Sequence, residues 1–354
     1  MLFFDKNINV IFIMLGFSCN FRCKYCLQHE NKHIEIYNKQ YNKDIIKFIL
    51  NQADRNEYGL AVQFFGGEPL LYLDTIKSIV NELKHHKNIH FTTITNGSLI
   101  TEDIANYLVE NDINVSISWD GRTTKQSRII DVFETNKENI FKLKNGFALS
   151  GVMNHYNSPK MFLEDVLKIK EEFKQYHNYE DDKINFNIDN LHNFTKSDEE
   201  IYKLNYEQYS KEMKEIFHNF LFDNEKNSSV ENDYASTFIY RLKEYREEHS
   251  ESYSRCGGGI DVLNLDLDGN LYLCHNETTK KLGSIYDNME SYMNNHKRVL
   301  DIPSRYKNHC SNCNVRFLCE YGCAINKVED ENCEFCTQQK AYYTPIIDTV
   351  LSVL

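Results

Sequence analysis

The sequence predicts an α/β fold with a parallel sheet, followed by a smaller module rich in cysteine. Short β-rich runs alternate with segments of helical apolar periodicity from residue 9 to about residue 190. Eight of the eleven cysteines lie at or after Cys256, which indicates a second module organised by metal more than by apolar packing. We therefore expect one domain at residues 1–190, a helical bridging region at 191–254 and a second domain at 255–354.

Composition excludes several classes of protein. With 41% hydrophobic and 13% aromatic residues the chain of 354 residues is too apolar to be disordered. Its formal charge of -12 argues against nucleic acid or an anionic membrane as the main partner. The longest apolar run, Val10–Phe17, is far too short to span a membrane. We expect a cytoplasmic protein whose clustered cysteines hold metal in a reducing compartment.

The expected strands follow one another with helical segments between them. Their ranges are Val10–Phe17, Ala61–Phe65, His90–Thr95, Asn114–Trp119, Ala148–Met153 and Ile184–Asp189. The intervening segments carry apolar residues at helical spacing, for example Ile45, Phe48 and Ile49. Parallel strands joined by helical crossovers gather functional residues at their carboxyl ends.

Residues 190–254 read as charged amphipathic helices. The expected helices are Glu199–Asn224 and Tyr234–Glu248. Phe217, Phe220 and Leu221 form the predicted buried stripe of the first helix. Solvated faces explain the charges, and we assign these helices no chemistry.

Cys19, Cys23 and Cys26 form a Cys-x3-Cys-x2-Cys motif directly after the first expected strand. Three thiolates this close in sequence can hold one iron–sulfur cluster, whereas a four-iron cluster normally takes one cysteine on each iron. One iron is then open, and an open metal position binds a substrate or cosubstrate. A zinc loop is the alternative, but such loops use Cys-x2-Cys pairs or Cys/His sets.

This motif resembles that of radical S-adenosylmethionine (SAM) enzymes. The resemblance implies a partial (β/α)6 radical SAM barrel and a four-iron (4Fe-4S) cluster held by Cys19, Cys23 and Cys26. It also implies that the open iron chelates the amino and carboxylate groups of S-adenosyl-L-methionine, which is cleaved on reduction to a 5′-deoxyadenosyl radical.

The loops after the second, third and fourth expected strands resemble the cosubstrate site of the same family. Gly66 and Gly67 permit close backbone approach to a ligand, and the Gly-Gly-Glu-Pro run resembles a motif whose backbone and Glu68 hold the methionyl amine. Asn-Gly and Asp-Gly pairs are also ordinary turn formers, so a turn interpretation stands beside the later contacts. The implied cosubstrate residues are Tyr25 against the adenine, Gly66, Gly67, Glu68 and Pro69, and Thr95, Asn96, Ser116, Ser118 and Asp120 near the ribose or carboxylate.

The later cysteines follow a second pattern. Residues 265–273 read as a β-hairpin turned by Asp268-Gly269, between Cys256 and Cys274. The whole set resembles the SPASM extension of radical SAM enzymes, which implies two auxiliary 4Fe-4S clusters. The resemblance implies Cys256, Cys274 and Cys323 for the inner cluster and Cys310, Cys313, Cys319 and a late cysteine, Cys333 or Cys336, for the outer one. Zinc knuckles are the alternative.

The inner cluster has two possible ligand sets. Some family members carry a further cysteine near the position of Cys256, but none lies between Cys26 and Cys256 here. The inner cluster is therefore open, ready for a substrate thiolate, or it is completed by one of the pair Cys333 and Cys336.

The resemblance implies an enzyme that modifies a ribosomally made peptide, first by thioether formation of the sactipeptide or ranthipeptide type. Sulfatase-maturing oxidation of Ser or Cys and peptide epimerisation are alternatives. In sulfatase-maturing enzymes an acid follows the second hairpin cysteine and serves as base, whereas His275 occupies that position here. A multi-cluster electron carrier or redox sensor is the non-enzymatic alternative.

The expected partners are a precursor peptide and a low-potential donor such as flavodoxin or ferredoxin. Because only nine residues precede the first expected strand, leader recognition uses the barrel, the helices of residues 190–254 or a separate leader-binding protein.

Overall fold

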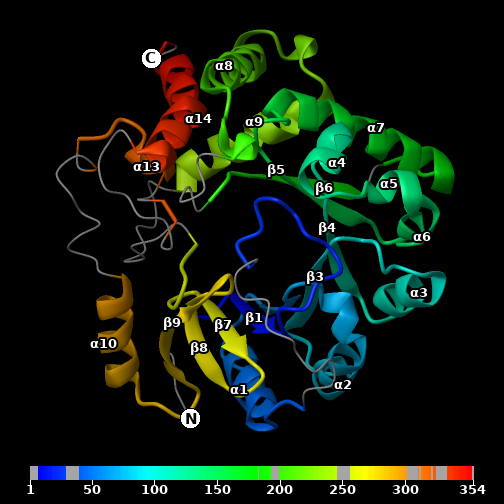
Figure 1. Cartoon of the computed structure of the whole chain (residues 1–354), viewed down its shortest axis with the longest axis vertical. Coiled ribbons are helices and arrows are strands. Elements are labelled where there is room, and N and C mark those ends of the chain that lie inside the picture. The colour runs from blue at the N-terminus through cyan, green and yellow to red at the C-terminus, as the bar shows by residue number, and fades with distance from the viewer. Residues whose placement is uncertain are drawn as a thin grey trace. The chain divides into compact units, whose positions relative to one another are not determined.

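The computed structural model describes residues 7–28, 40–181, 183–192, 199–244, 256–300, 310, 312–319, 322–323 and 333–352. The chain divides into two compact units, shown in Figure 1. The first unit comprises Met1–Ser118, Ile129–Leu149 and Cys256–Ile302. The second unit comprises Trp119–Arg128, Ser150–Arg255 and Pro303–Leu354. The chain therefore passes between the units several times, and the units do not follow the boundaries expected at residues 190 and 254.

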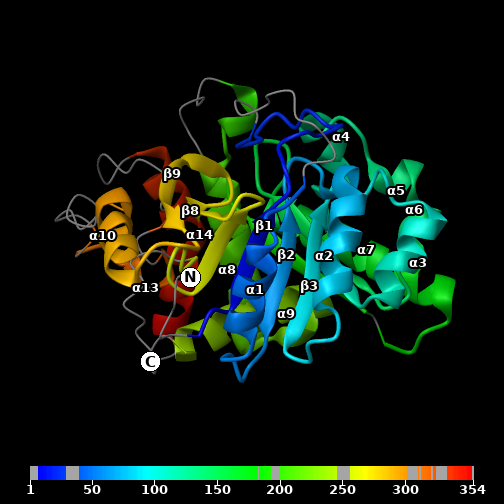
Figure 2. The same cartoon turned by 90° about the horizontal axis from the view of Figure 1, so that it is seen from below.

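The six expected strands are present, each within a residue of its expected start. They are β1 (Val10–Met14), β2 (Leu60–Phe65), β3 (Ile89–Thr95), β4 (Ile113–Ser118), β5 (Phe147–Val152) and β6 (Ile184–Asp189). In the first unit β1 to β4 pair in parallel and lie side by side, as Figure 2 shows for β1, β2 and β3. The strand β1 ends at Met14 rather than Phe17, since the chain turns away at Gly16 toward the first cysteine motif.

The expected hairpin extends the same sheet. Its strands are β7 (Val262–Asp266) and β8 (Asn270–Cys274), which pair antiparallel and are joined by a turn in which Gly269 has a φ of 90°. A third strand, β9 (Glu277–Ser284), pairs with β8. Because β7 pairs in parallel with β1, the hairpin belongs to the first unit instead of a separate module. Pairing between strands so far apart in sequence leaves no local signal in the chain.

The helices of the first unit bury one apolar face each. Ile45, Phe48 and Ile49 of the first helix are buried, as their spacing predicts. Glu68 and Thr101 cap the 3-10 helix η2 and the helix α3 with their side-chain oxygens. The helices are α1 (Asp44–Ala53), η2 (Pro69–Tyr72), α2 (Leu73–Leu83), α3 (Glu102–Glu110), α5 (Val132–Thr135), α6 (Lys137–Phe141) and α10 (Met289–Leu300).

The helices of the second unit differ in part from expectation. The buried stripe of α8 is Tyr209, Met213, Ile216 and Phe217, whereas Leu221 is exposed and Phe220 is half-buried. Ser228 and Glu231 form a reciprocal capping box that starts α9 at Ser229, and residues 245–248 of the expected helix lie outside the described residues. The helices are η3 (Gly121–Thr123), α4 (Thr124–Ser127), α7 (Pro159–His177), η5 (Glu200–Tyr202), α8 (Tyr206–Phe222), η6 (Asn224–Lys226), α9 (Ser229–Glu244), α13 (Arg316–Cys319) and α14 (Glu334–Leu351).

In the second unit α14 packs along α8, as Figure 1 shows. The hydroxyl of Ser210 on α8 donates to the carbonyl of Ala341 on α14, at 2.9 Å. Within the described ranges, no helix has the length and apolar character that crossing a membrane requires.

Candidate cosubstrate and cluster sites

The loop that carries Cys19, Cys23 and Cys26 is held at its start by the end of β2. The backbone N–H of Gly67 donates to the carbonyl of Gly16, and that of Glu68 to the carbonyl of Ser18, both at 2.9 Å. The N–H of Ser18 donates to the hydroxyl of Tyr72 at 3.0 Å, and this tyrosine is buried. The sequence analysis missed Tyr72, because no local pattern distinguishes it from an ordinary helix residue.

Gly66 and Gly67 are glycines because backbone lies against them. A Cβ on Gly66 would stand 2.4 Å from the carbonyl oxygen of Gly16, and a Cβ on Gly67 would stand 2.3 Å from that of Ser18. Both distances are far below van der Waals contact. The close approach expected of this glycine pair is therefore made first to the cysteine loop itself.

The carboxylate of Glu68 braces the ends of β2 and β3. It is 1% exposed and accepts from the N–H of Leu70 at 3.0 Å, from the hydroxyl of Thr95 at 2.6 Å and from the N–H of Asn96 at 2.8 Å. Burial raises the pKa of this carboxyl, and the three donors oppose that shift. The structure shows Glu68 as a brace, and its contact with a cosubstrate stays a proposal.

A polar network links the cysteine loop to the end of β3. The side-chain amide of Asn96 donates to Asn20, and that of Asn20 donates to Ser98, both at 2.8 Å. The oxygen of Asn96 in turn accepts from the N–H of Ser98 at 2.9 Å. Asn20 lies inside the cysteine motif, so its position was a signal that the sequence analysis left unused.

Three more of the expected cosubstrate residues of the first unit are half-buried, whereas Pro69 is buried. Ser116 and Ser118 lie on the face of β4 opposite to the buried residues Val115 and Ile117. Tyr25 is the third half-buried residue and lies within the cysteine loop. The exposures of these three residues suit ligand contact.

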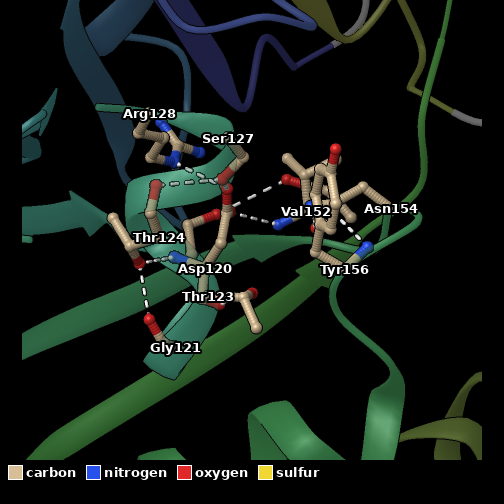
Figure 3. Close-up of polar contacts among 11 residues, drawn as sticks. Asp120, Gly121, Thr123, Thr124, Ser127, Arg128, Val152, Asn154 and Tyr156 are labelled. Atoms are coloured by element: carbon tan, nitrogen blue, oxygen red, sulfur yellow. Dashed lines mark hydrogen bonds and ion pairs between the residues drawn. The ribbon is translucent and has the colours of Figure 1, made fainter. Parts of the chain in front are cut away.

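Asp120 lies at the start of the second unit and is fully buried. Figure 3 shows its polar contacts. Its carboxylate accepts from the N–H of Val152 at 2.9 Å and from the hydroxyl of Ser127, and it pairs with the guanidinium of Arg128 at 3.2 Å. The contacts favour a structural role for Asp120 over the cosubstrate contact that the resemblance implied. The buried cation Arg128 was not predicted, because its ion pair with Asp120 becomes apparent only in the folded chain.

We predict that Asp120→Ala destabilises the protein by about 3–5 kcal/mol, because it leaves the buried charge of Arg128 without this carboxylate. Chemical denaturation followed by circular dichroism measures the effect. Glu164→Ala, which removes an exposed ion pair with Arg122, is the matched control and should cost less than about 1 kcal/mol. Equal losses in the two variants would contradict the structural role.

His275 lies on the face of the sheet in the first unit. Its ring stacks on Phe12 of β1 at a centroid distance of 4.1 Å and meets Phe65 of β2 edge-on at 4.3 Å. The side chain of Asn264, which the register of β1 with β7 places beside Phe12, lies 3.2 Å from Nδ1 of His275. Burial lowers the pKa of His275 to about 4, so the ring is neutral at neutral pH.

Asn264 determines the tautomer of His275. Its amide nitrogen donates to the carbonyls of Tyr272 and Leu273, at 3.2 and 3.0 Å, so its oxygen faces the histidine as an acceptor. From this network Nδ1 is assigned as the donor and Nε2 as the atom with the lone pair. Among the described residues, Nε2 has no hydrogen-bond partner.

Cys256 and Cys274 are brought toward each other in the first unit. The glycine loop after Cys256 packs on the end of β8, where a Cβ on Gly258 would stand 2.5 Å from the carbonyl oxygen of Leu273 and 3.4 Å from the sulfur of Cys256. The sulfur of Cys274 accepts from the N–H of Asn276 at 3.4 Å. Hydrogen bonds from backbone N–H to cysteine sulfur are typical around iron–sulfur clusters and tune their potentials.

Cys336 of the second unit has three other late cysteines as neighbours. Its thiol, on the first turn of α14, is hydrogen-bonded to Cys333, and Cys319 and Cys310 are the further neighbours. Burial is the largest cause that raises the pKa of the Cys336 thiol, followed by these neighbours. Cys313, of the expected outer set, and Cys323, of the inner set, are half-buried as well.

The three thiol groups of the first motif suit an iron–sulfur cluster. Cysteines around a four-iron cluster each bind a different iron, so they stand further apart than the ligands of one ion. In the first motif the sulfur of Cys19 accepts from the N–H of Phe21 at 3.3 Å, and all three thiols are half-buried. Three reachable thiols on one loop suit a cluster with an open iron.

Residues 13–204 match the Radical SAM superfamily. The chain therefore belongs to this superfamily and is an enzyme of the radical SAM class, as the first cysteine motif predicts, and S-adenosylmethionine and one 4Fe-4S cluster are its cofactors. The electron-carrier alternative is thereby set aside.

Two curated relatives resemble the chain over most of its length. It is 25% identical to a cysteine-type anaerobic sulfatase-maturating enzyme of Clostridium novyi, over 91% of this chain and 89% of the relative. It is 26% identical to the enzyme of the same description from Clostridium perfringens, over 95% of both chains. A radical SAM cyclopropyl synthase, TigE, of Paramaledivibacter caminithermalis is 31% identical over 39% of this chain, and the match spans 33% of that synthase.

Solved structures share the fold. A histidine-tagged form of anSMEcpe with bound AdoMet has a TM-score of 0.68 at 20% identity, covering 98% of this chain and 95% of that one. Native anSMEcpe with bound AdoMet and the Cp18Cys peptide has a TM-score of 0.66 at 21% identity, covering 97% and 98%. The mixed α/β fold with a parallel sheet is therefore confirmed.

Proposed function

We propose that this radical SAM enzyme forms a thioether between a cysteine sulfur and a carbon atom of a ribosomally made peptide. The observation behind the proposal is the hydrogen bond of Cys336 to Cys333 at the start of α14, with Cys319 and Cys310 of the expected outer set as further neighbours. Because both late cysteines accompany the outer set, the SPASM assignment keeps Cys256, Cys274 and Cys323 for the inner cluster. Three ligands leave room for the thiolate of a substrate cysteine.

Known relatives support a peptide substrate. Full-length relatives are described as sulfatase-maturating enzymes, and a structure with this fold holds a peptide beside AdoMet. The precursor peptide, a flavodoxin or ferredoxin as electron donor and a separate leader-binding protein are the partners that we propose.

The residues of the first unit would bind the first cluster and the cosubstrate. Cys19, Cys23 and Cys26 would hold the first cluster, which with S-adenosylmethionine supplies a 5′-deoxyadenosyl radical when bound. Gly66, Gly67 and Pro69 would frame the methionyl group beside this loop, with Asn96, Ser116 and Ser118 toward the carboxylate and ribose and Tyr25 against the adenine. Removal of a hydrogen atom from a peptide carbon and of a proton from the thiol leaves one electron, for which an auxiliary cluster would be the acceptor.

Sulfatase-type oxidation of Ser or Cys is the second candidate, since the whole-length relatives carry that description. In that reaction His275 would be the base, at the position where sulfatase-maturing enzymes carry an acidic residue. Asn264 holds its Nδ1 as donor, so that Nε2 is the atom that would accept the substrate proton.

Product analysis separates the two candidates. We incubate the anaerobically reconstituted enzyme with S-adenosylmethionine, dithionite and either the Cp18Cys peptide or the peptide encoded beside the gene. Thioether formation predicts loss of one C–H and one S–H hydrogen by mass spectrometry, with no free thiol and no aldehyde. An aldehyde that reacts with hydrazine in the Cp18Cys peptide would overturn the thioether proposal in favour of the second candidate.

A further inference from the structure

The loop from Cys256 to Val262 is held by hydrogen bonds within itself and by others from α10. Gly257 and Gly259 both have positive φ, at 62° and 82°. Within the loop, the carbonyl of Gly257 accepts from the N–H groups of Ile260, Asp261 and Val262, and the N–H of Gly259 donates to the carbonyl of Val262. The carbonyls of Gly258 and Gly259 point elsewhere, and their partners lie on α10.

Two residues of α10, one turn apart, bind these consecutive carbonyls. The hydroxyl of Tyr292 donates to the carbonyl of Gly259 at 2.9 Å. Nε2 of His296 lies 3.0 Å from the carbonyl of Gly258, and since a carbonyl only accepts, this nitrogen is the donor. Both side chains are almost fully buried, at 0% and 3% exposed. Their i and i+4 spacing places them on one face of the helix.

Two glycines of the loop are closely packed against their neighbours. A Cβ on Gly259 would stand 2.6 Å from the ring of His296 and 2.7 Å from the side chain of Leu282. On its other side the loop touches the carbonyl of Leu273, the residue before Cys274. The loop of Cys256 therefore packs between the helix α10 and the end of β8 that carries Cys274.

We propose that Tyr292 and His296 are positioning residues for the inner auxiliary cluster. They hold the backbone beside Cys256 so that its thiol stands with that of Cys274 at the separation one cluster needs. Neither residue ligates iron. The inference rests on the proposed SPASM clusters and concerns the inner one alone.

The test compares single variants of the anaerobically reconstituted protein. His296→Leu removes the donor, whereas His296→Gln restores an amide donor near the same carbonyl. Tyr292→Phe removes one oxygen and keeps the ring, so it preserves the packing. Asn295→Ala is the matched control, because Asn295 on the same helix donates to the carbonyl of Leu282 and not to the glycine loop.

We expect about twelve irons per chain in the wild type and in Asn295→Ala, and about eight in His296→Leu. Tyr292→Phe should keep its iron but show a shifted electron paramagnetic resonance signal for one auxiliary cluster. His296→Gln should restore both the iron content that His296→Leu loses and the wild-type signal. Release of 5′-deoxyadenosine should be unchanged throughout, since it needs only the first cluster.

Wild-type iron content and an unchanged auxiliary signal in both His296→Leu and Tyr292→Phe would overturn the proposal. Failure of His296→Gln to restore the iron would also count against it, because a lost donor would then not be the cause. About four irons in the wild type would instead refute the SPASM clusters, and the positioning role with them.

Discussion

Replacing Cys19, Cys23 and Cys26 together with alanine will reduce the release of 5′-deoxyadenosine by more than about a hundredfold, to background. The reason is that these three thiols are the proposed ligands of the cluster at which S-adenosylmethionine is cleaved. Chromatography of the cosubstrate after anaerobic reduction measures this directly.

The same triple variant carries its own control. The proposed auxiliary clusters have other cysteines as ligands, so iron should fall only from about twelve to about eight per chain. The secondary structure should persist. Cosubstrate cleavage that survives in this variant would be incompatible with the assignment of the first motif.

Gly67→Ala will remove most of the activity without touching a ligand. Its Cβ would stand 2.3 Å from the carbonyl oxygen of Ser18 and 2.5 Å from that of Phe17. Both atoms are backbone, so the loop that carries Cys19 must move. We expect loss of about four irons per chain and at least a tenfold loss of cosubstrate cleavage.

Gly59→Ala is the matched control for this substitution. Gly59 precedes the opposite end of β2 and has a positive φ, but the Cβ there meets the exposed side chain of His90, which can turn away. It should cost about 1 kcal/mol of stability and leave cleavage intact. Similar losses of cleavage in the two variants would show that strain in β2, rather than the cysteine loop, causes the effect.

Local pattern was sufficient for much of this protein. The strands were predictable because β-branched and aromatic residues gather in short runs, and the amphipathic α1 because its apolar residues recur at helical spacing. The stripe of α8 was misjudged, since a helix with aromatic residues on several sides does not reveal which side meets α14. The first cysteine motif could be recognised without knowledge of the fold, because its three thiols lie in one short loop.

Asp120 shows where such reasoning stops. Its Asp-Gly pair fitted both a turn and a cosubstrate contact, and only the positions of Val152 and Arg128 show that its carboxylate is used inside the protein. Glu68 is similar, because the donors that surround it come from the next strand.

The sequence by itself determined the chemistry of this protein, because iron–sulfur ligation depends on thiol spacing within a few residues. Tertiary structure decided what surrounds Cys256 and Cys274. It set the pairing of β7 with β1, the stacking of His275 on Phe12 and the hydrogen bond from α10 to the loop of Cys256. Each of these depends on the register between segments far apart in the chain. Such register is set by the packing of whole elements, and no short stretch of sequence encodes it.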